Sequence, residues 1–179
     1  MRERLERVSG LAYLKHLLKR PELRHFGKVA WIMPSLAARD RNLAWLQTMG
    51  HATGPDDCYL APVYPSAGEL HDGVLLAWIQ ARRPRHVIIA LGGGVQERLG
   101  WFLKQNCTYA PGIHCAGAAI GFLSGDQVHI PDWVDRYFLG WLLRCLHRPV
   151  RFTPRYIKAA RLAWLLWRYR GKSPPSCAG

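Results

Sequence analysis

Acidic residues are scarce in this sequence, and residues 136–179 contain none. The chain has 12 Asp and Glu against 25 Lys and Arg, a formal net charge of +13 with its eight histidines counted as neutral. Ten of the basic residues fall within residues 136–179, so most of the net charge lies toward the C-terminal end. We therefore expect an anionic partner: nucleic acid, a phosphorylated ligand or an acidic membrane surface.

Long apolar runs are also missing. The longest ones, residues 87–91 and 162–167, are much shorter than the ~20 residues that span a bilayer. The N-terminal apolar segment is interrupted by Lys15 and His16 and lacks a small-residue cleavage site. We expect neither a membrane-crossing helix nor a signal peptide.

Paired cysteine motifs are absent as well. The five cysteines are an odd number at wide spacings with no CxxC pair, a pattern that favours reduced thiols and a cytoplasmic location. His114 beside Cys115, with Cys107 upstream, matches no common zinc spacing, and the sequence has no G-x-S-x-G element of a serine hydrolase. No metal and no cofactor are expected. The cysteines are Cys58, Cys107, Cys115, Cys145 and Cys177.

The chain does have the length and the apolar content of one compact domain. It has 179 residues, 49% of them hydrophobic, and folding at this size buries roughly 70% of the unfolded surface. Short apolar runs alternate with helical patterns, which predicts parallel strands joined by right-handed crossovers. Ser66 and Glu69 form a capping-box pattern at the start of one helix. The predicted strands are 29–33, 58–64, 86–91 and about 112–116, and the predicted helices are 36–49, 66–82 and 95–105.

A basic, helical appendage follows this α/β body. Pro131 predicts the start of a helix that ends at Pro149, and Thr153 predicts the start of a last helix through Tyr169. At ~100° per residue the last helix has a narrow basic sector and a broad apolar arc, which is typical of a helix lying on an anionic membrane surface. Packing of the arc on the sheet is the alternative. The basic sector holds Lys158, Arg161, Arg168 and Lys172, and the arc holds Leu162, Ala163, Trp164, Leu166 and Trp167.

A glycine-rich turn, LGGGVQE at residues 91–97, directly follows a predicted strand and begins a helix. Glycines at the carboxyl end of a parallel strand let the backbone approach a ligand, and the helix N-terminus offers N–H groups to an anion. The pattern indicates a nucleotide-diphosphate site. It is neither GxGxxG nor a P-loop, and a tight turn without a ligand is the alternative. Glu97 is either a ligand-loop carboxylate or a first-turn charge that stabilises the helix dipole.

Three ordered motifs resemble those of a family of bacterial glycosyltransferases. LGGGVQE at 91–97, GAAIGFLSG at 117–125 and IPDWVDRYFLGWLLRCLHRPVRFTPRY at 130–156 are similar in order and spacing to motifs of the WecG/TagA/CpsF family. The opening RVSGLAYLKHLL at 7–18 resembles the segment before the family's middle strand. The resemblance implies a Rossmann-like α/β enzyme that needs no metal. Such an enzyme transfers an N-acetylhexosamine-type sugar, with inversion, from a UDP-sugar to a polyprenyl-diphosphate-linked acceptor at the cytoplasmic membrane face.

The sequence gives three groups of candidate site residues, two from the resemblance and one from the amphipathic helix. The nucleotide-sugar group is Gly92, Gly93, Gln96, Glu97 and Gly117. The diphosphate group is Arg144, Arg151 and Arg155, whose guanidinium groups would stabilise the charge of a leaving UDP and of a lipid diphosphate. The membrane-facing group is Trp164, Trp167, Arg161 and Arg168.

The chain departs from the family pattern at charged positions. Gly94 and Val95 replace the Pro-Lys of the nucleotide-sugar loop, and Gly121, His129 and Gly140 stand where the family has Asp, Arg and Glu. The resemblance covers the C-terminal two-thirds of the family pattern, and the N-terminal section with its general-base aspartate has no counterpart. Sugar transfer needs a carboxylate near the acceptor hydroxyl, and that base stays unassigned. The sequence offers Asp40, Asp56, Asp57 and Asp72.

We expect a Rossmann-like body at residues 1–128, a basic helical appendage at 129–172 and a flexible tail at 173–179. The leading hypothesis is a peripheral glycosyltransferase of cell-surface polysaccharide or teichoic-acid-type synthesis at the inner face of the plasma membrane. The alternative is a non-catalytic membrane-surface or partner-binding module derived from this fold. A second copy of the chain or a separate N-terminal half is the expected protein partner. Nucleic acid is not expected, because the aromatic residues alternate with aliphatic ones at helical spacing instead of forming stacking platforms.

Overall fold

The structure is a computed structural model. It describes residues 9–25 and 27–125 and, near the C-terminus, Ile157, Ala160, Leu162, Ala163, Trp164, Trp167 and Arg168. The chain divides into two compact units, residues 1–129 and 130–179. The first unit holds all the strands described below.

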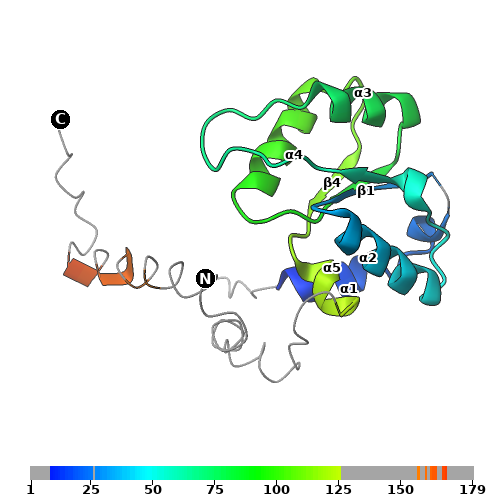
Figure 1. The fold of residues 1–179 in the computed structure, drawn as a ribbon, viewed down its shortest axis with the longest axis horizontal. Helices are drawn as coiled ribbons and strands as arrows, with labels where there is room; N and C mark the ends of the chain where they lie inside the picture. Colours follow the sequence, from blue (N-terminus) through cyan, green and yellow to red (C-terminus); the bar gives the residue numbers. More distant parts are fainter. Residues whose placement is uncertain are drawn as a thin grey trace, which may run out of the picture. The chain divides into compact units, whose positions relative to one another are not determined.

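The centre of the first unit is a sheet of four parallel strands, as the sequence predicts (Figure 1). The strands are β1 (Val29–Met33), β2 (Cys58–Leu60), β3 (His86–Ile89) and β4 (Gly112–Cys115), in the spatial order β2-β1-β3-β4. In the ladders Val29 pairs with His86, and Ile89 pairs with Cys115. All five residues of β1 are buried, which is typical of a parallel strand covered on both faces.

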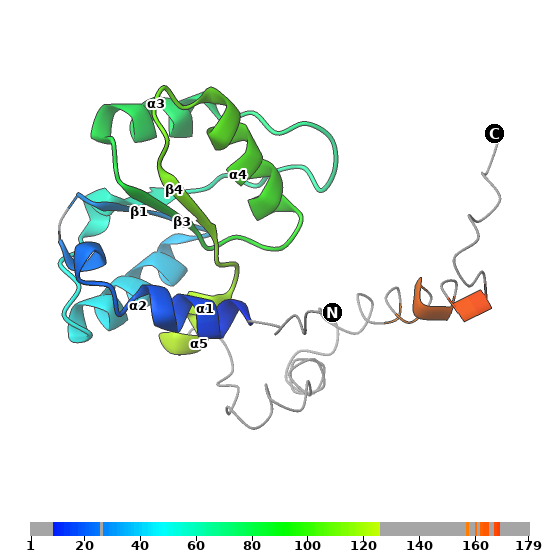
Figure 2. The same cartoon turned by 180° about the vertical axis from the view of Figure 1, so that it is seen from behind.

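Helices cover both faces of the sheet. The helices α3 (Gly73–Arg82) and α4 (Val95–Asn106) lie on one face, while α1 (Gly10–Leu17), α2 (Leu36–Thr48) and α5 (Ala119–Leu123) lie on the other (Figures 1 and 2). Two short 3₁₀ helices, η1 (Pro21–Arg24) and η2 (Pro55–Asp57), precede β1 and β2. This arrangement is a Rossmann-like α/β fold and confirms the predicted fold class of this unit.

Alternation along the strands divides the core into two layers. Trp31 and Ile88 pack with α1, α2 and α5, whereas Ile32, Val87 and Ile89 pack with α3 and α4. Each of these side chains is almost fully buried, and burial of one large aliphatic side chain stabilises a fold by about 1.5–3 kcal/mol. The two layers together hold the strand ends, and therefore the loops at both edges of the sheet, in fixed positions.

The direction of the connections reverses once, at β1. The chain moves from β1 to β2 through α2 on one face, and then returns past β1 to β3 through α3 on the other face. Crossovers of a single hand require such a change of face when the direction reverses. The carboxyl ends of β1 and β3 therefore form the topological switch point, where ligands bind in open α/β sheets.

One helix starts later than the sequence predicts. The predicted helix 66–82 begins at Gly73, and the predicted capping box of Ser66 and Glu69 is wrong. The actual N-cap is Asp72, whose carboxylate accepts a hydrogen bond from the Leu75 backbone N–H at 2.8 Å. Residues 61–72 form a loop instead, in part because the prolines at 62 and 65 are poor partners in a strand ladder. The strands β2 and β3 also end earlier than predicted, at residues 60 and 89.

The described residues near the C-terminus are α-helical, and they fall within the predicted last helix. The predicted helix between residues 131 and 149 lies outside the described residues. The division of the chain into segments 1–128, 129–172 and 173–179 remains a prediction. Among the residues that the structure describes, no helix has the length and apolarity to cross a bilayer.

Candidate functional site

The glycine turn lies at the switch point, directly after β3. Ala90 and Leu91 are still buried, whereas Gly92, Gly93 and Gly94 are exposed. Gly94 has φ 87°, a conformation that L side chains rarely adopt, and it is the N-cap of α4. The turn is closed by a hydrogen bond from the Gln96 N–H to the Gly92 carbonyl at 3.2 Å.

A second glycine, at the carboxyl end of β4, lies against this turn. Gly117 has φ 58°, and a Cβ built on it would lie 3.4 Å from Gln96 Oε1 and 3.6 Å from the Leu91 carbonyl oxygen. The backbone N–H of Gly117 donates to the Ile89 carbonyl at 3.1 Å. The structure thus brings two sequence motifs together at one edge of the sheet, and with them all five residues of the nucleotide-sugar group.

Glu97 stabilises the start of α4. Its Oε2 accepts a hydrogen bond from the Gly94 N–H at 2.5 Å, and its Oε1 accepts one from Gln96 Nε2 at 2.8 Å. A carboxylate in the first turn also interacts favourably with the positive end of the helix dipole. The first-turn role that the sequence left open is therefore observed. The carboxylate is exposed, so it is accessible to a ligand from the solvent side.

Gln96 carries an unsatisfied acceptor beside the two glycines. Its Oε1 is buried and accepts no hydrogen bond from any described residue. A buried acceptor without a donor costs about 1–3 kcal/mol, so this oxygen would gain from an O–H or N–H group brought by a ligand. The backbone carbonyl of the same residue is 3.5 Å from the thiol of Cys115, whose pKa is raised by burial and by the charge of Glu97.

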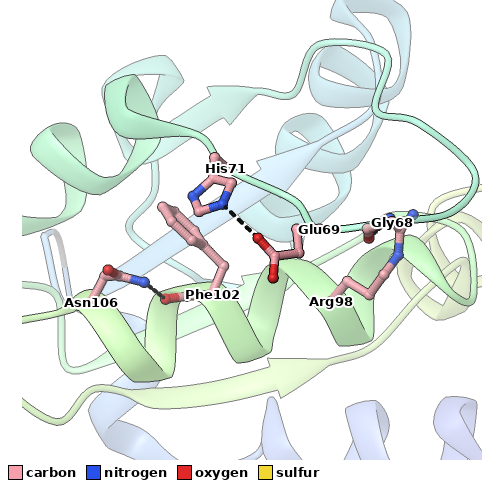
Figure 3. Close-up of polar contacts among 6 residues, drawn as sticks. All are labelled: Gly68, Glu69, His71, Arg98, Phe102 and Asn106. Carbon is pink, nitrogen blue, oxygen red and sulfur yellow. Dashed lines mark hydrogen bonds and ion pairs between the residues drawn. The ribbon is translucent and has the colours of Figure 1, made fainter.

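Arg98 joins the glycine turn to the loop of residues 61–72, and Figure 3 shows its side chain beside Gly68 of that loop. Its Nε donates to the Gly94 carbonyl at 3.0 Å, and its two terminal nitrogens donate to the carbonyls of Gly68 at 2.8 Å and Pro65 at 2.5 Å. A planar guanidinium can hold several carbonyls at fixed angles. No sequence pattern pointed to Arg98, and its position directly after the Gln-Glu pair is the one local signal.

A buried carboxylate fixes the other end of the same loop. Asp72 accepts hydrogen bonds from the hydroxyls of Tyr59 at 3.0 Å and Tyr64 at 2.6 Å, in addition to the bond that caps α3. Burial and this carboxylate raise the pKa of Tyr59 to about 12 and also raise that of Tyr64. Both phenols therefore remain protonated donors at neutral pH. Asp72 serves the fold in this way, and it is the least suitable of the four aspartates to act as a general base.

Two other aspartates also have structural contacts. Asp40 forms an ion pair with Arg39 at 2.8 Å, and Asp57 accepts a hydrogen bond from the Gly54 N–H at 2.9 Å. A further carboxylate, Glu69, lies on the loop of residues 61–72, with its Oε2 3.4 Å from His71 Nε2 (Figure 3). This carboxylate and imidazole are both exposed.

The described part of the chain does not group His114, Cys107 and Cys115 as metal ligands. His114 contacts Tyr13 through Nδ1 and His86 through Nε2, and Cys107 is the C-cap residue of α4. Residues 9–25 and 27–125 contain no group of three or more His, Cys, Asp or Glu side chains arranged to hold a metal ion. The cysteines at 58, 107 and 115 are free thiols, and burial raises the pKa of each.

The predicted C-terminal site residues are only partly described. Arg144, Arg151, Arg155 and Arg161 lie outside the described residues. Trp164 and Trp167 are 49% and 68% exposed. The Arg168 guanidinium lies 5.0 Å from the ring centroid of Trp164, a cation–π contact between residues one helical turn apart.

Comparison with known proteins places the chain in a family. Neither the curated proteins nor the solved structures give a match. A family model described as Glycosyl transferase WecG/TagA/CpsF family matches residues 1–175. The chain therefore belongs to the WecG/TagA/CpsF family of glycosyltransferases, which act in cell-surface polysaccharide synthesis.

Proposed function

We propose that this chain binds a UDP-sugar and takes part in transfer of an N-acetylhexosamine-type sugar to a polyprenyl-diphosphate-linked acceptor. One observation carries the proposal: the turn that holds Gly92, Gly93 and Gln96 follows β3 at the switch point of the parallel sheet, and Gly117 at the end of β4 lies against Gln96. Ligands of α/β sheets bind at this point. Family membership supplies the reaction type.

The glycine turn is the proposed site for the donor diphosphate. A Cβ on Gly92 would have no neighbour within 4 Å, so a ligand can approach the backbone there. Gln96 Oε1 lacks a donor, and Glu97 is exposed. Hydroxyl groups of the sugar or ribose are suitable partners for both oxygens.

In the proposed reaction an acceptor hydroxyl attacks the anomeric carbon, the bond from that carbon to the UDP oxygen breaks, and the configuration inverts. Negative charge develops on the leaving diphosphate, and the proposed partners of that charge are Arg144, Arg151 and Arg155. The hydroxyl proton must pass to a base. Asp72 is committed to two tyrosines and a helix cap, and we propose that the base comes from a second copy of the chain or from a separate N-terminal half.

The helix near the C-terminus is the proposed membrane contact. Trp164 and Trp167 are exposed aromatic side chains, and Arg168 stacks on the first of them. Tryptophan and arginine favour the interface of an anionic bilayer. The acceptor is a lipid, so we place the chain at the inner face of the plasma membrane.

Ligand binding by the full chain tests the donor site. We expect UDP and UDP-N-acetylhexosamine to raise the melting temperature of the purified chain, and Gln96→Leu to weaken that effect about tenfold in ligand concentration. The matched control is Gln80→Leu on α3, whose amide bonds to the Asn106 carbonyl away from the glycine turn. Equal stabilisation of both variants by UDP, or stabilisation of neither variant nor the parent, would contradict the proposal.

A transfer assay separates the enzyme from a non-catalytic module of the same fold. UDP release from UDP-N-acetylhexosamine in the presence of a polyprenyl-diphosphate acceptor is expected once the base-bearing partner is added. UDP-sugar binding without release, under all pairings, would favour the non-catalytic module.

Vesicle binding tests the membrane contact separately. Vesicles of phosphatidylcholine and phosphatidylglycerol should retain the parent chain and release a Trp164→Ala/Trp167→Ala variant. The control is Trp101→Ala on α4, which removes another exposed tryptophan. Equal retention of the two variants would remove the helix from the proposal.

A further inference from the structure

A basic pocket lies at the opposite edge of the sheet from the glycine turn. It has a volume of about 430 Å³ and is lined by residues that precede β1, β3 and β4 and by the first residue of β3. Arg20 forms an ion pair with Glu22 at 3.6 Å, so Arg83 and Arg85 supply the surplus of positive charge in the pocket. We call it the amino-edge pocket; it is lined by Arg20, Glu22, Arg83, Pro84, Arg85, His86, Tyr109 and Ala110.

The backbone at Arg83 is the first sign that the pocket is more than a solvated basic face. This residue is the C-cap of α3 and has φ 49° and ψ 48°, the left-handed conformation in which glycine is usually found. A non-glycine residue in this conformation loses roughly 1 kcal/mol or more. The presence of a long cationic side chain at such a position points to a role for that side chain.

Aromatic stacking fixes the direction of that side chain. The Arg83 guanidinium lies 4.9 Å from the ring centroid of Tyr109. The Tyr109 hydroxyl donates to the Pro84 carbonyl at 3.0 Å, so the ring cannot turn freely. Arg83 and Tyr109 both line the pocket, and their stacking holds the guanidinium at its wall.

A chain of hydrogen bonds orients His86 at the same wall. His86 Nδ1 lies 3.0 Å from His114 Nε2, and His114 Nδ1 lies 2.7 Å from the Tyr13 hydroxyl. When the Tyr13 hydroxyl donates its hydrogen bond to His114 Nδ1, the proton of a neutral His114 is on Nε2, and that N–H donates a hydrogen bond to His86 Nδ1. The proton of a neutral His86 is then on its own Nε2. This nitrogen has no hydrogen-bond partner within residues 9–25 and 27–125.

We propose that the amino-edge pocket binds the phosphate or diphosphate group of a second anionic ligand, through Arg20, Arg83, Arg85 and His86. Guanidinium groups bind phosphate oxygens through paired hydrogen bonds, and an imidazole N–H adds a further donor. The proposal is independent of the donor site, because the pocket residues lie before the strands or, in the case of His86, at the first residue of β3, whereas the glycine turn follows β3.

The groups facing His86 give the site a pH dependence. They are Arg20 and Glu22 after α1, Arg85 before β3, His114 on β4 and, through His114, Tyr13 on α1. Burial lowers the pKa of His86, Glu22 raises it, and Arg85 and Arg20 lower it further. An anion bound between the arginines would offset their effect, so its binding should raise this pKa and strengthen as the pH falls.

NMR of the histidine rings in the full chain tests the proposal. Pyrophosphate should shift the His86 ring resonances and raise the pKa of His86. Arg83→Gly should weaken pyrophosphate binding at this ring at least about tenfold, while its melting temperature stays level or rises because glycine suits the backbone. The control is Arg82→Gln, whose guanidinium stacks on Trp78 and does not line the pocket. A pH series with sulfate, which keeps its charge in this range, isolates the contribution of His86.

Vesicles distinguish a lipid phosphate from a soluble one. If Arg83→Gly lowers binding to vesicles of phosphatidylcholine and phosphatidic acid relative to Arg82→Gln, the ligand is a lipid headgroup. If the two variants bind vesicles equally but differ for pyrophosphate, the ligand is soluble. A His86 ring that responds to neither probe, or equal effects of the two variants on both, would overturn the proposal. The rise in melting temperature that UDP causes in Arg83→Gly tests the donor site at the glycine turn and does not test the amino-edge pocket.

Discussion

The two edges of the parallel sheet differ in the groups that they offer to an anion. At the carboxyl edge, the glycine turn precedes the N-terminus of α4, and the glycines leave the backbone accessible. At the amino edge, the pocket lies beside the C-terminus of α3 at Arg83. Helix N-termini carry partial positive charge and C-termini partial negative charge. Backbone groups can therefore hold an anion at the first edge, whereas side-chain charge must do so at the second.

The charged residues of both edges also complement the helix dipoles. Glu97 lies in the first turn of α4, and Arg82 lies in the last turn of α3. Interaction with the helix dipole accounts for one charged residue at each helix end. It does not account for the presence of Arg20 and Arg85 in the pocket, because neither residue lies in α3. Substitutions that remove a stabilising side chain from one edge at a time test how the two edges differ.

The largest effect is expected at Asp72, which supports the carboxyl edge. Asp72→Ala removes the N-cap of α3 and leaves the hydroxyls of Tyr59 and Tyr64 without their acceptor. We expect a loss of about 3 kcal/mol in the free energy of unfolding, measured by urea denaturation. Tyr64→Phe, which removes one of these hydrogen bonds, should cost about 1 kcal/mol. Equal losses for the two variants would show that the carboxylate does not organise the loop.

Arg98→Ala should have the next largest effect, about 2 kcal/mol, because three carbonyls lose their donor. UDP binding should weaken with it, since the glycine turn loses one of its supports. The control is Lys104→Ala on the same helix, which removes an ammonium 5.6 Å from the ring centroid of the exposed Trp101. The free energy of unfolding and the UDP affinity of both variants are measured by urea denaturation and by UDP titration. An unchanged UDP affinity in Arg98→Ala would show that the loop of residues 61–72 does not support the donor site.

Acid should weaken the amino edge through His114. Burial, together with the charges of His86 and Arg20, lowers the pKa of His114 from 6.5 to about 4. Because the folded-state pKa lies below the unfolded value, this stabilisation is present above pH 6.5 and is lost as the pH falls toward 4. We expect about 1–2 kcal/mol for a partly solvated ring. Urea denaturation at several pH values should give a flatter profile for His114→Gln, and parallel profiles would contradict the assignment.

The smallest effect on stability separates two glycines of the carboxyl edge. Gly117→Ala places a methyl group at positive φ and 3.4 Å from Gln96 Oε1, and should cost about 1 kcal/mol. Gly92→Ala meets nothing within 4 Å and has no positive φ, so its melting temperature should not change. Both variants should nevertheless bind UDP less well, since each adds a methyl group at the proposed site. A Gly92→Ala variant that binds UDP normally would place the diphosphate elsewhere.

Local patterns predicted the sheet well. The strand 29–33 has the predicted bounds, the strands are parallel, and α4 begins at the predicted residue 95. Each of these rests on neighbouring residues: an apolar run with β-branched side chains, or a turn followed by a helical period. The glycine turn was identified for the same reason, because its residues are contiguous.

Features built from distant segments were not predictable in this way. The start of α3 depends on Asp72, whose partners Tyr59 on β2 and Tyr64 lie 13 and 8 residues away, and a capping-box pattern at Ser66 was the more conspicuous local signal. The Arg98 contacts join residues about thirty positions apart. The amino-edge pocket combines three separate segments, so no motif marks it.

The contacts of Arg98 have a mechanical consequence. One guanidinium holds a carbonyl of the glycine turn and two carbonyls of the loop of residues 61–72, so neither segment can move far without the other. Opening of this loop and rearrangement of the turn should therefore occur as one event. Backbone amides of residues 66–68 and 92–94 are expected to exchange with deuterium at similar rates, and a ligand seated at the turn should slow exchange in the loop that it does not touch.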